Sequence, residues 1–220
     1  MIPIDKLVRS KRKTLSLIVE TDGTLTVRAP VRMNETDIRS FIDLKAGWIK
    51  RKQAEARKAA PVEHRYLDGE TFPYLGKQVP LRLVPDARPA LVMDRVFKLS
   101  RQAQPKAASV FEAWYKKQAR AVLTERVDFY ARKYGFNVEK VRVSSARTRW
   151  GSCSAKKTLS FTWRLVMAPP DVVDYVVVHE LCHLRELNHS KAFWAQVEAI
   201  LPGYRGQRKW LKVNGGKLHL

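Results

Sequence analysis

The sequence predicts an α+β protein with a β-rich N-terminal region and a helical C-terminal region that contains a small antiparallel sheet. Alternating apolar and polar residues, broken by glycine turns, recur over residues 14–99. A long helical pattern covers residues 107–134 and ends at Gly135, a residue type that commonly terminates helices. A third pattern, apolar and helical, leads into the run His179-Glu180-Leu181-Cys182-His183.

The composition allows one large domain or two small ones. The chain has 220 residues, of which 45% are hydrophobic, an ordinary share for a globular protein. The character of the sequence changes between Ser100 and Pro105, where the strand pattern stops and the long helix has not yet begun. We therefore predict a domain boundary here, between residues 1–104 and residues 105–220.

The N-terminal region is predicted to contain a hairpin, one helix and further strands. Residues 14–19 and 24–29 alternate around the turn Thr21-Asp22-Gly23. Residues 34–59 have a helical apolar face, and Asn34 is suited to cap the first turn. Further strands are expected at residues 65–67, 72–75, 79–84 and 92–99, with turns at Asp68-Gly69 and Gly76-Lys77.

Two strands and two more helices are expected after the long helix. Residues 140–144 and 158–163 alternate as strands, and we expect them to form a hairpin against the long helix. Pro169-Pro170-Asp171 suits the start of a helix, because proline fits the first turn and a carboxylate favours the positive end of the dipole. Ser190 can cap a last helix over residues 191–201.

The run from His179 to His183 has the spacing of a metal site on a helix. Residues four apart on a helix differ by only about 40° in direction, so the two histidines would project from one face. Glu180 would lie beside the first histidine, within reach of water at the metal. In this HExxH pattern the histidines hold zinc and the glutamate acts as a general base. The apolar residues 172–178 predict a buried helix, on which such polar side chains need partners.

A catalytic zinc ion normally has a third protein ligand, and we expect one such ion per chain. His189 is the preferred candidate, because a helix that ends near Asn188 could turn His189 back towards the motif. Asn188 can adopt the left-handed conformation that such a turn would use. Glu186 and Glu198 are the alternatives. Cys182 is interpreted as a buried structural cysteine.

A second polar segment, residues 147–154, lies between the two expected C-terminal strands. It contains Arg147, Arg149, a glycine and small hydroxyl residues. An arginine here could bind a substrate carboxylate or phosphate through two hydrogen bonds, or stabilise an oxyanion. Arg149 is therefore a candidate catalytic residue. The alternative is a charged loop that Trp150 anchors to the core.

The net charge of +21, from 42 Lys and Arg against 21 Asp and Glu, favours anionic partners such as nucleic acid or nucleotides. The two cysteines do not form a disulfide framework, and residues 1–13 lack the apolar run of a signal peptide. No segment approaches the roughly 18 apolar residues that span a membrane. We expect a cytoplasmic, reduced protein without a membrane partner, and leave its oligomeric state open.

Several segments together resemble one protein family. They are Arg149-Trp150-Gly151-Ser152-Cys153-Ser154, Arg164-Leu165, Ala168-Pro169, the HExxH run, Asn188-His189-Ser190 and Phe193-Trp194, with weaker N-terminal matches at residues 10–14, 22–23, 29–30, 48–49 and 74–77. In these residues the chain resembles the YgjP-like metal-dependent hydrolases, which are similar to minimal zincins and SprT-like metallopeptidases. The resemblance covers nearly the whole chain. It implies a zincin-like catalytic region with zinc ligands His179, His183 and His189 and the base Glu180, but no particular substrate.

The leading hypothesis is a zinc-dependent, metallopeptidase-like hydrolase in which Glu180 takes the proton of an activated water. The second is a metal-dependent nucleotide phosphohydrolase of the nucleoside triphosphate pyrophosphatase type, motivated by the net charge and by Arg147, Arg149 and Arg164. The third is a DNA-associated SprT-like protease or nucleic-acid-binding module, supported by analogy alone. The expected partners are therefore a peptide or nucleotide substrate and, through the basic surface, nucleic acid.

Overall fold

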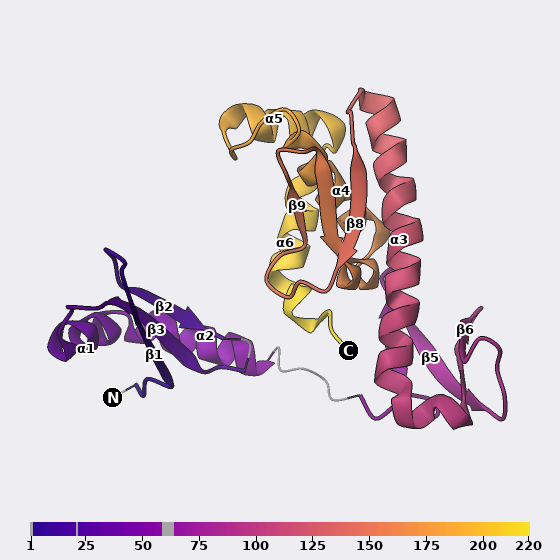
Figure 1. The fold of residues 1–220 in the computed structure, drawn as a ribbon, viewed down its shortest axis with the longest axis horizontal. Coiled ribbons are helices and arrows are strands. Elements are labelled where there is room, and N and C mark those ends of the chain that lie inside the picture. Colours follow the sequence, from indigo (N-terminus) through magenta and orange to yellow (C-terminus); the bar gives the residue numbers. More distant parts are fainter. Residues whose placement is uncertain (1, 21, 59–63) are drawn as a thin grey trace. The chain divides into compact units, whose positions relative to one another are not determined.

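The structure is a computed structural model that describes residues 2–20, 22–58 and 64–220. The chain divides into two compact units, Met1–Val62 and Glu63–Leu220, and each unit has its own hydrophobic core. Both units contain groups of strands followed by groups of helices, which confirms the α+β class (Figure 1). The predicted turn residue Thr21 and the predicted helix end at Ala59 lie outside the described residues.

The first unit contains a three-stranded sheet, ordered β1-β3-β2. Strands β2 (Ser16–Val19) and β3 (Leu25–Pro30) pair antiparallel, so the predicted hairpin is confirmed. Strand β1 (Lys6–Ser10), which the sequence pattern did not reveal, pairs parallel to β3. Alternate side chains of the central strand β3 are fully buried and form the sheet side of the core, namely Leu25, Val27 and Ala29.

The predicted single helix over residues 34–59 is two helices, α1 (Glu35–Leu44) and α2 (Ala46–Lys58). A straight helix of that length would extend about 37 Å, well beyond strands of six residues that reach about 20 Å. The break lets Ile38 and Ile42 of α1 and Ile49 of α2 all pack into the small core. The capping role of Asn34 is confirmed, because its side chain accepts a hydrogen bond from the Asp37 N–H at 2.7 Å.

The second unit begins with a four-stranded sheet, ordered β4-β5-β7-β6. Its strands are β4 (Thr71–Tyr74), β5 (Lys77–Val84), β6 (Leu91–Met93) and β7 (Phe97–Ser100). The structure corrects two predictions in this region. Residues 65–67 are not a strand, since the N–H groups of Arg65 and Leu67 donate to the Glu70 carboxylate instead of a neighbouring strand. Residues 92–99 are two antiparallel strands, because a turn at Asp94 separates β6 from β7.

The long helix α3 (Ala107–Tyr134) has the predicted bounds, and Gly135 ends it in the left-handed conformation at φ 67°. Its aromatic side chains pack against the preceding sheet, with the rings of Phe72 and Phe111 centred 4.3 Å apart. The 3₁₀ helix η1 (Arg101–Lys106) makes the connection. The predicted boundary at 104/105 therefore falls inside the second unit, because the sheet and α3 share one core.

A second small sheet in this unit has the order β8-β10-β9. Strands β8 (Lys140–Ser144) and β10 (Thr158–Thr162) are parallel neighbours, so the predicted hairpin between them is wrong. A parallel pair needs a connection of about a dozen residues or more, and the segment between these strands provides it. That segment contains β9 (Gly151–Cys153), which pairs antiparallel with β10 and forms an edge of the sheet.

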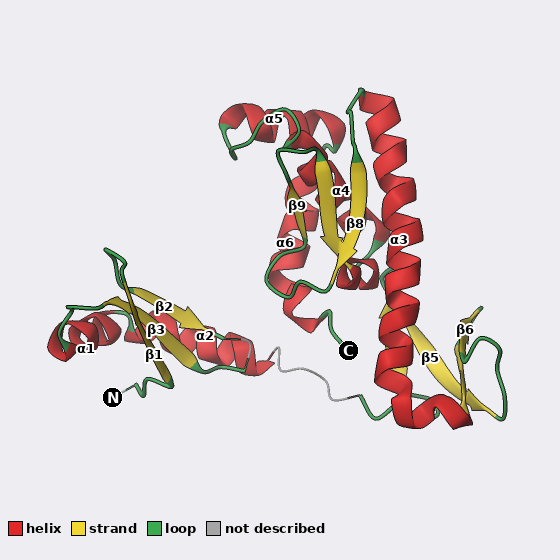
Figure 2. Ribbon diagram, viewed as in Figure 1, coloured by secondary structure: helices red, strands yellow, loops and turns green. Residues whose placement is uncertain are grey.

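The remaining elements are the 3₁₀ helix η2 (Trp163–Met167), the helices α4 (Pro170–Cys182), α5 (Lys191–Ile200) and α6 (Tyr204–Asn214), and the 3₁₀ helix η3 (Gly215–Lys217). Helix α4 packs against α3, α5, α6 and β9, so most of its circumference is buried (Figure 2). Helix α6 was not predicted. Within the part of the chain that is described, no helix is long and apolar enough to cross a membrane.

Candidate functional site

The start of α4 rests on the turn between β4 and β5. Pro170 occupies the first turn of the helix, where its missing N–H costs nothing. The Leu75 N–H donates to the Val166 carbonyl at 2.7 Å, which ties the turn to the segment that precedes the helix. Gly76, at φ 77°, approaches so closely that an added Cβ would lie 3.0 Å from the Cα of Pro169. The sheet that contains β4 and β5 thus fixes where α4 begins.

An ion pair with α3 holds α4 from the side. The Asp174 carboxylate accepts hydrogen bonds from Nε and Nη2 of Arg126, the latter at 2.7 Å, and from the Tyr130 hydroxyl at 3.1 Å. The guanidinium also stacks on the Phe129 ring at 4.9 Å. This two-pronged geometry restrains rotation of the helix and hence the direction of side chains further along it.

Three histidines come together at the end of α4. His179 lies in the last turn, His183 is the C-cap residue, and His189 follows in the connection to α5. Their ligand nitrogens lie within 4.8 Å of one another, and the Nε2 atoms of His179 and His189 are 3.0 Å apart. Tetrahedral zinc with bonds of about 2.05 Å holds its nitrogen ligands about 3.3 Å apart. The cluster therefore has dimensions that suit a zinc ion.

His189 reaches the pair through a tight turn after α4. The N–H groups of Arg185 and Glu186 both donate to the Cys182 carbonyl, so the chain reverses immediately after the helix. Asn188 is not left-handed, contrary to the prediction. Ser190 then starts α5, as predicted, by accepting a hydrogen bond from the Phe193 N–H at 3.2 Å.

The first turn of α5 supplies the packing that holds the imidazoles. The Phe193 ring is centred 4.9 Å from His179, 4.6 Å from His183 and 4.8 Å from His189. The Trp194 ring stacks on His189 at 5.6 Å. The three imidazoles are thus oriented by aromatic contacts from the following helix.

The protonation of the histidines suits metal binding. Burial lowers the pKa of His179 to about 3, and the charges of His183, His189 and Arg208 add to the effect. The pKa of His189 is lowered by the same kinds of interaction. Nδ1 of His183 lies 3.0 Å from the Glu186 carbonyl, which can only accept, so this nitrogen carries the proton and Nε2 keeps a free lone pair. Neutral imidazoles with free lone pairs are what zinc requires.

The alternative ligands lie outside the cluster. Among the described residues, the ligand-capable group consists of the three histidines and includes neither Glu186 nor Glu198. The Glu198 carboxylate instead pairs with Arg205 at 3.4 Å. Cys182 is fully buried, and burial raises the pKa of its thiol to about 11, as befits a structural cysteine.

Glu180 lies against the edge strand β9. Its side chain is 5% exposed, and burial raises its pKa to about 7, while the positive charge of Arg149 acts in the opposite direction. The glycine at position 151 leaves room for the Glu180 side chain, because a Cβ on Gly151 would lie 2.6 Å from both Cγ and Oε1 of Glu180. The glycine of β9 is therefore required by the close approach of the carboxylate.

The three arginines that the sequence grouped interact with different parts of the structure. Arg149 is exposed and its charge acts on Glu180. Arg164 instead stacks on Trp163 at 4.2 Å and donates to the Ser145 carbonyl. Burial lowers the pKa of Arg164, and the positive charge of Arg147 lowers it further. Only Arg149 is thus associated with the Glu180 side of the site.

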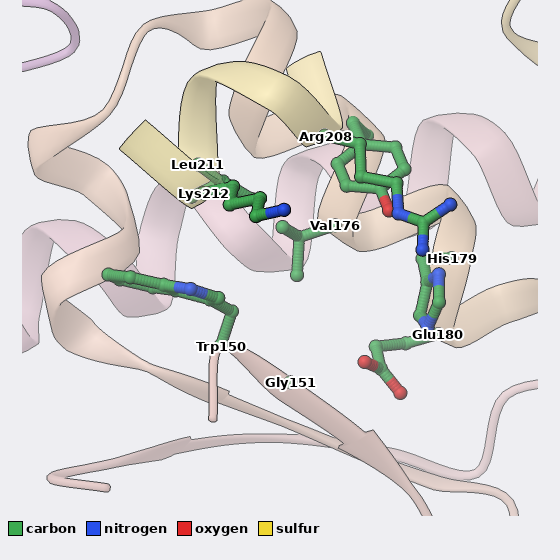
Figure 3. A pocket seen from close by; sticks show the side chains of 9 residues that line it. Trp150, Gly151, Val176, His179, Glu180, Arg208, Leu211 and Lys212 are labelled. Carbon is green, nitrogen blue, oxygen red and sulfur yellow. The ribbon is translucent and has the colours of Figure 1, made fainter. Parts of the chain in front are cut away.

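A pocket of about 360 Å³ adjoins His179 and Glu180 (Figure 3). Its lining residues come from β9 and the residue before it, from α4 and from α6: Trp150, Gly151, Tyr175, Val176, His179, Glu180, Arg208, Leu211 and Lys212. The contribution of the α6 residues to the pocket was not predicted from the sequence. The signal was present, since the buried residues Tyr204 and Leu211 have the seven-residue spacing of one helix face.

Comparisons with known proteins show which family the chain resembles. A family model described as "YgjP-like, metallopeptidase domain" matches residues 13–214. No curated protein matches the chain. Among solved structures, the metallopeptidase zymogen abylysin of Pyrococcus abyssi is 20% identical, with a TM-score of 0.40 over 43% of this chain and 96% of that chain.

Proposed function

Because the chain belongs to the YgjP-like family, we propose that it is a zinc-dependent metallopeptidase in which the pocket beside α4 binds the substrate. The proposed catalytic region is zincin-like, with α4 as the motif helix and β9 as the adjoining edge strand. The convergence of three histidines beside a buried glutamate is the observation that carries this proposal. The Nε2 atoms of His179 and His189, 3.0 Å apart, are close to the spacing of about 3.3 Å that tetrahedral zinc imposes on nitrogen ligands.

Each residue of the site has a distinct proposed role. His179, His183 and His189 hold the zinc ion through ring nitrogens that converge at the end of α4. When bound, the ion supplies a Lewis acid that activates water and polarises a carbonyl. Phe193 and Trp194 restrict the rotation of the imidazoles, which keeps the three lone pairs convergent.

Glu180 is the proposed general base. Its carboxylate accepts a proton from the attacking water and afterwards delivers that proton to the leaving amine. The contact with Gly151 fixes the carboxylate against β9, and the burial of Glu180 limits competing exchange with bulk water. Arg149, on the same side, is proposed to stabilise negative charge on the substrate.

The proposal is tested first by metal content. We expect about one equivalent of zinc in the purified chain by elemental analysis, as for a single catalytic site. His189→Ala should lose the ion, whereas Glu198→Ala should keep it, because Glu198 lies outside the histidine cluster. Zinc retained by His189→Ala and lost by Glu198→Ala would contradict the proposed ligand set.

The second test is turnover. The zinc-loaded chain should cleave members of a mixed peptide library, and Glu180→Gln should keep the metal but lose activity by about 10²–10⁴-fold. Wild-type activity in Glu180→Gln would overturn the proposed mechanism. Cleavage of nucleoside triphosphates but of no peptide, by the zinc-loaded wild type, would favour the phosphohydrolase instead.

A further inference from the structure

Helix α6 places two positive side chains on the pocket wall opposite β9. Arg208 and Lys212 lie one helical turn apart, so they share a face of α6. In Figure 3 the Lys212 ammonium points into the pocket and the Arg208 guanidinium lies beside His179. Two cations therefore border the space next to the histidine cluster.

Neither cation has a protein counter-ion within the described ranges 2–20, 22–58 and 64–220. The ion pairs found there include Arg205 of α6 with Glu198 of α5, but none involves Arg208 or Lys212. Arg208 instead stacks on the Trp194 ring, with its Cζ 4.6 Å from the centroid. Stacking holds the guanidinium in place while its N–H donors stay free at the edge.

The charge of Arg208 is directed at the histidine cluster. Its guanidinium stacks on Trp194, and the Trp194 ring in turn stacks on His189. Of the described residues that line the pocket, Glu180 is the single acid, whereas Arg208 and Lys212 both come from α6. The α6 side thus has an excess of positive charge.

The rest of the pocket wall is apolar. Trp150, Val176 and Leu211 face the space between the cations and β9 (Figure 3). Trp150 is held against η3, where a Cβ on Gly215 would lie 2.8 Å from its Cζ2. Apolar walls lower the local dielectric and strengthen an ion pair formed inside. They also accommodate the aliphatic part of a peptide side chain.

We infer that Arg208 and Lys212 recognise a substrate carboxylate, so that this enzyme prefers peptides with a negative charge close to the scissile bond. The carboxylate belongs to an aspartate or glutamate side chain, or to a free C-terminus. The guanidinium provides paired N–H donors that match a carboxylate, and the ammonium adds a second charge. This inference rests on the proposed peptidase function and defines its substrate class.

Cleavage-site mapping provides the first test. Peptide libraries prepared without trypsin are treated with the zinc-loaded wild type. The cleaved peptides should show acidic residues, or a free C-terminus, enriched at one position near the scissile bond. A matched glutamate and glutamine substrate pair should differ by about tenfold in kcat/KM, equivalent to one charge-assisted contact. Arg208→Gln and Lys212→Gln should each reduce this ratio towards one. Lys209→Gln, an exposed cation on α6 outside the pocket lining, should keep it.

A binding measurement separates failure of the inference from failure of the proposed function. Zinc-loaded Glu180→Gln is titrated with acetyl-Ala-Glu-Ala-amide and acetyl-Ala-Gln-Ala-amide, and then with acetyl-Ala-Ala-Ala as free acid and as amide, while tryptophan fluorescence is followed. Tighter binding of an acidic probe, lost in Arg208→Gln but kept in Lys209→Gln, supports the inference even if no peptide is cleaved. The pair that shows the preference identifies the side chain or the C-terminus as the source.

Two results would overturn the inference. One is equal binding and cleavage of acidic and neutral probes by the wild type. The other is an acidic preference that persists in the double variant Arg208→Gln/Lys212→Gln. Displacement of the acidic probe by inorganic triphosphate at far lower concentration would instead assign the two cations to a phosphate-bearing ligand.

Discussion

Helices α4 and α6 line the same pocket but differ in how firmly the fold holds them. Helix α4 is buried along nearly its whole length, and its buried residues include Glu180. Helix α6 buries only Tyr204 and Leu211 among its described residues, and most of its other side chains are exposed or partly exposed. One wall of the pocket is therefore part of the core, whereas the other is a surface.

This difference separates two demands on a catalytic pocket. Groups that perform chemistry must be held within a fraction of an ångström, and the packing of α4 against α3, α5, α6 and β9 provides that restraint. Groups that recognise a substrate can lie on an exposed face, where a substitution changes specificity at little cost to the fold. We therefore expect substitutions on α4 to affect metal binding, turnover and stability more than substitutions on α6.

The largest effect is expected from His183→Ala. Removing a ligand should reduce zinc affinity by more than the roughly 10–100-fold that follows loss of an outer hydrogen-bond partner, and activity should fall with it. Isothermal titration with zinc and a peptide-cleavage assay measure both. His219→Ala provides a control, since His219 lies outside the ligand cluster. Unchanged zinc affinity in His183→Ala would remove this residue from the site.

A matched pair of glycine substitutions tests the two walls directly. Gly151→Ala places a methyl 2.6 Å from Glu180, so the carboxylate must move, and we expect kcat to fall by about 100-fold, as for a misplacement of about 1 Å. Gly206→Ala, in α6, meets no atom within 4 Å. It should leave kcat unchanged and stabilise the chain by up to about 1 kcal/mol. Equal kcat values in the two variants would show that β9 does not position Glu180.

The anchor of α4 on α3 should contribute measurably to stability. Asp174→Ala removes the acceptor for Arg126 and Tyr130, and we expect the free energy of unfolding to decrease by about 2 kcal/mol. This change is measured from the unfolding transition of the second unit in urea. Gln207→Ala, which removes one hydrogen bond from α6 to Asp171, should have a smaller effect. A larger decrease in the free energy of unfolding for Gln207→Ala than for Asp174→Ala would mean that α6 is held more firmly than α4.

The smallest effect is expected for Arg205→Gln on α6. Its pair with Glu198 has side chains that are 78% and 45% exposed, and water screens such pairs almost completely. The thermal midpoint of unfolding should therefore stay within error of the wild type at low and at high salt. A clear decrease in the midpoint would mean that α6 is held more firmly than its exposure indicates.

The parts of the site that were predictable depend on local geometry. The positions of His179, Glu180 and His183 follow from the period of a single helix, and the bounds of α3 and the cap at Asn34 follow from local signals. The convergence of His189 was anticipated from its spacing, but its route was not. The turn uses Cys182 as a double acceptor in place of a left-handed Asn188.

The parts that were missed depend on contacts between distant segments. Strand pairing is not encoded in one segment, so the parallel register of β8 and β10 and the added strand β1 could not be read from alternation alone. The domain boundary was misplaced for the same reason, because a change in local pattern does not reveal a shared core. Helix α6 was overlooked because its one apolar face lies among many charged residues.

The aromatic contact between the first sheet of the second unit and α3 has a consequence for biosynthesis. Phe72 packs on Phe111, and Phe97 packs on Trp114. The partner of each of these sheet residues lies in α3 and is therefore synthesised later. At about 5–20 residues per second, the ribosome needs roughly 2–8 s to add the residues between Phe72 and Phe111. The aromatic core of the second unit can therefore be completed only after α3 has been synthesised, so the sheet depends on the long helix for its folding.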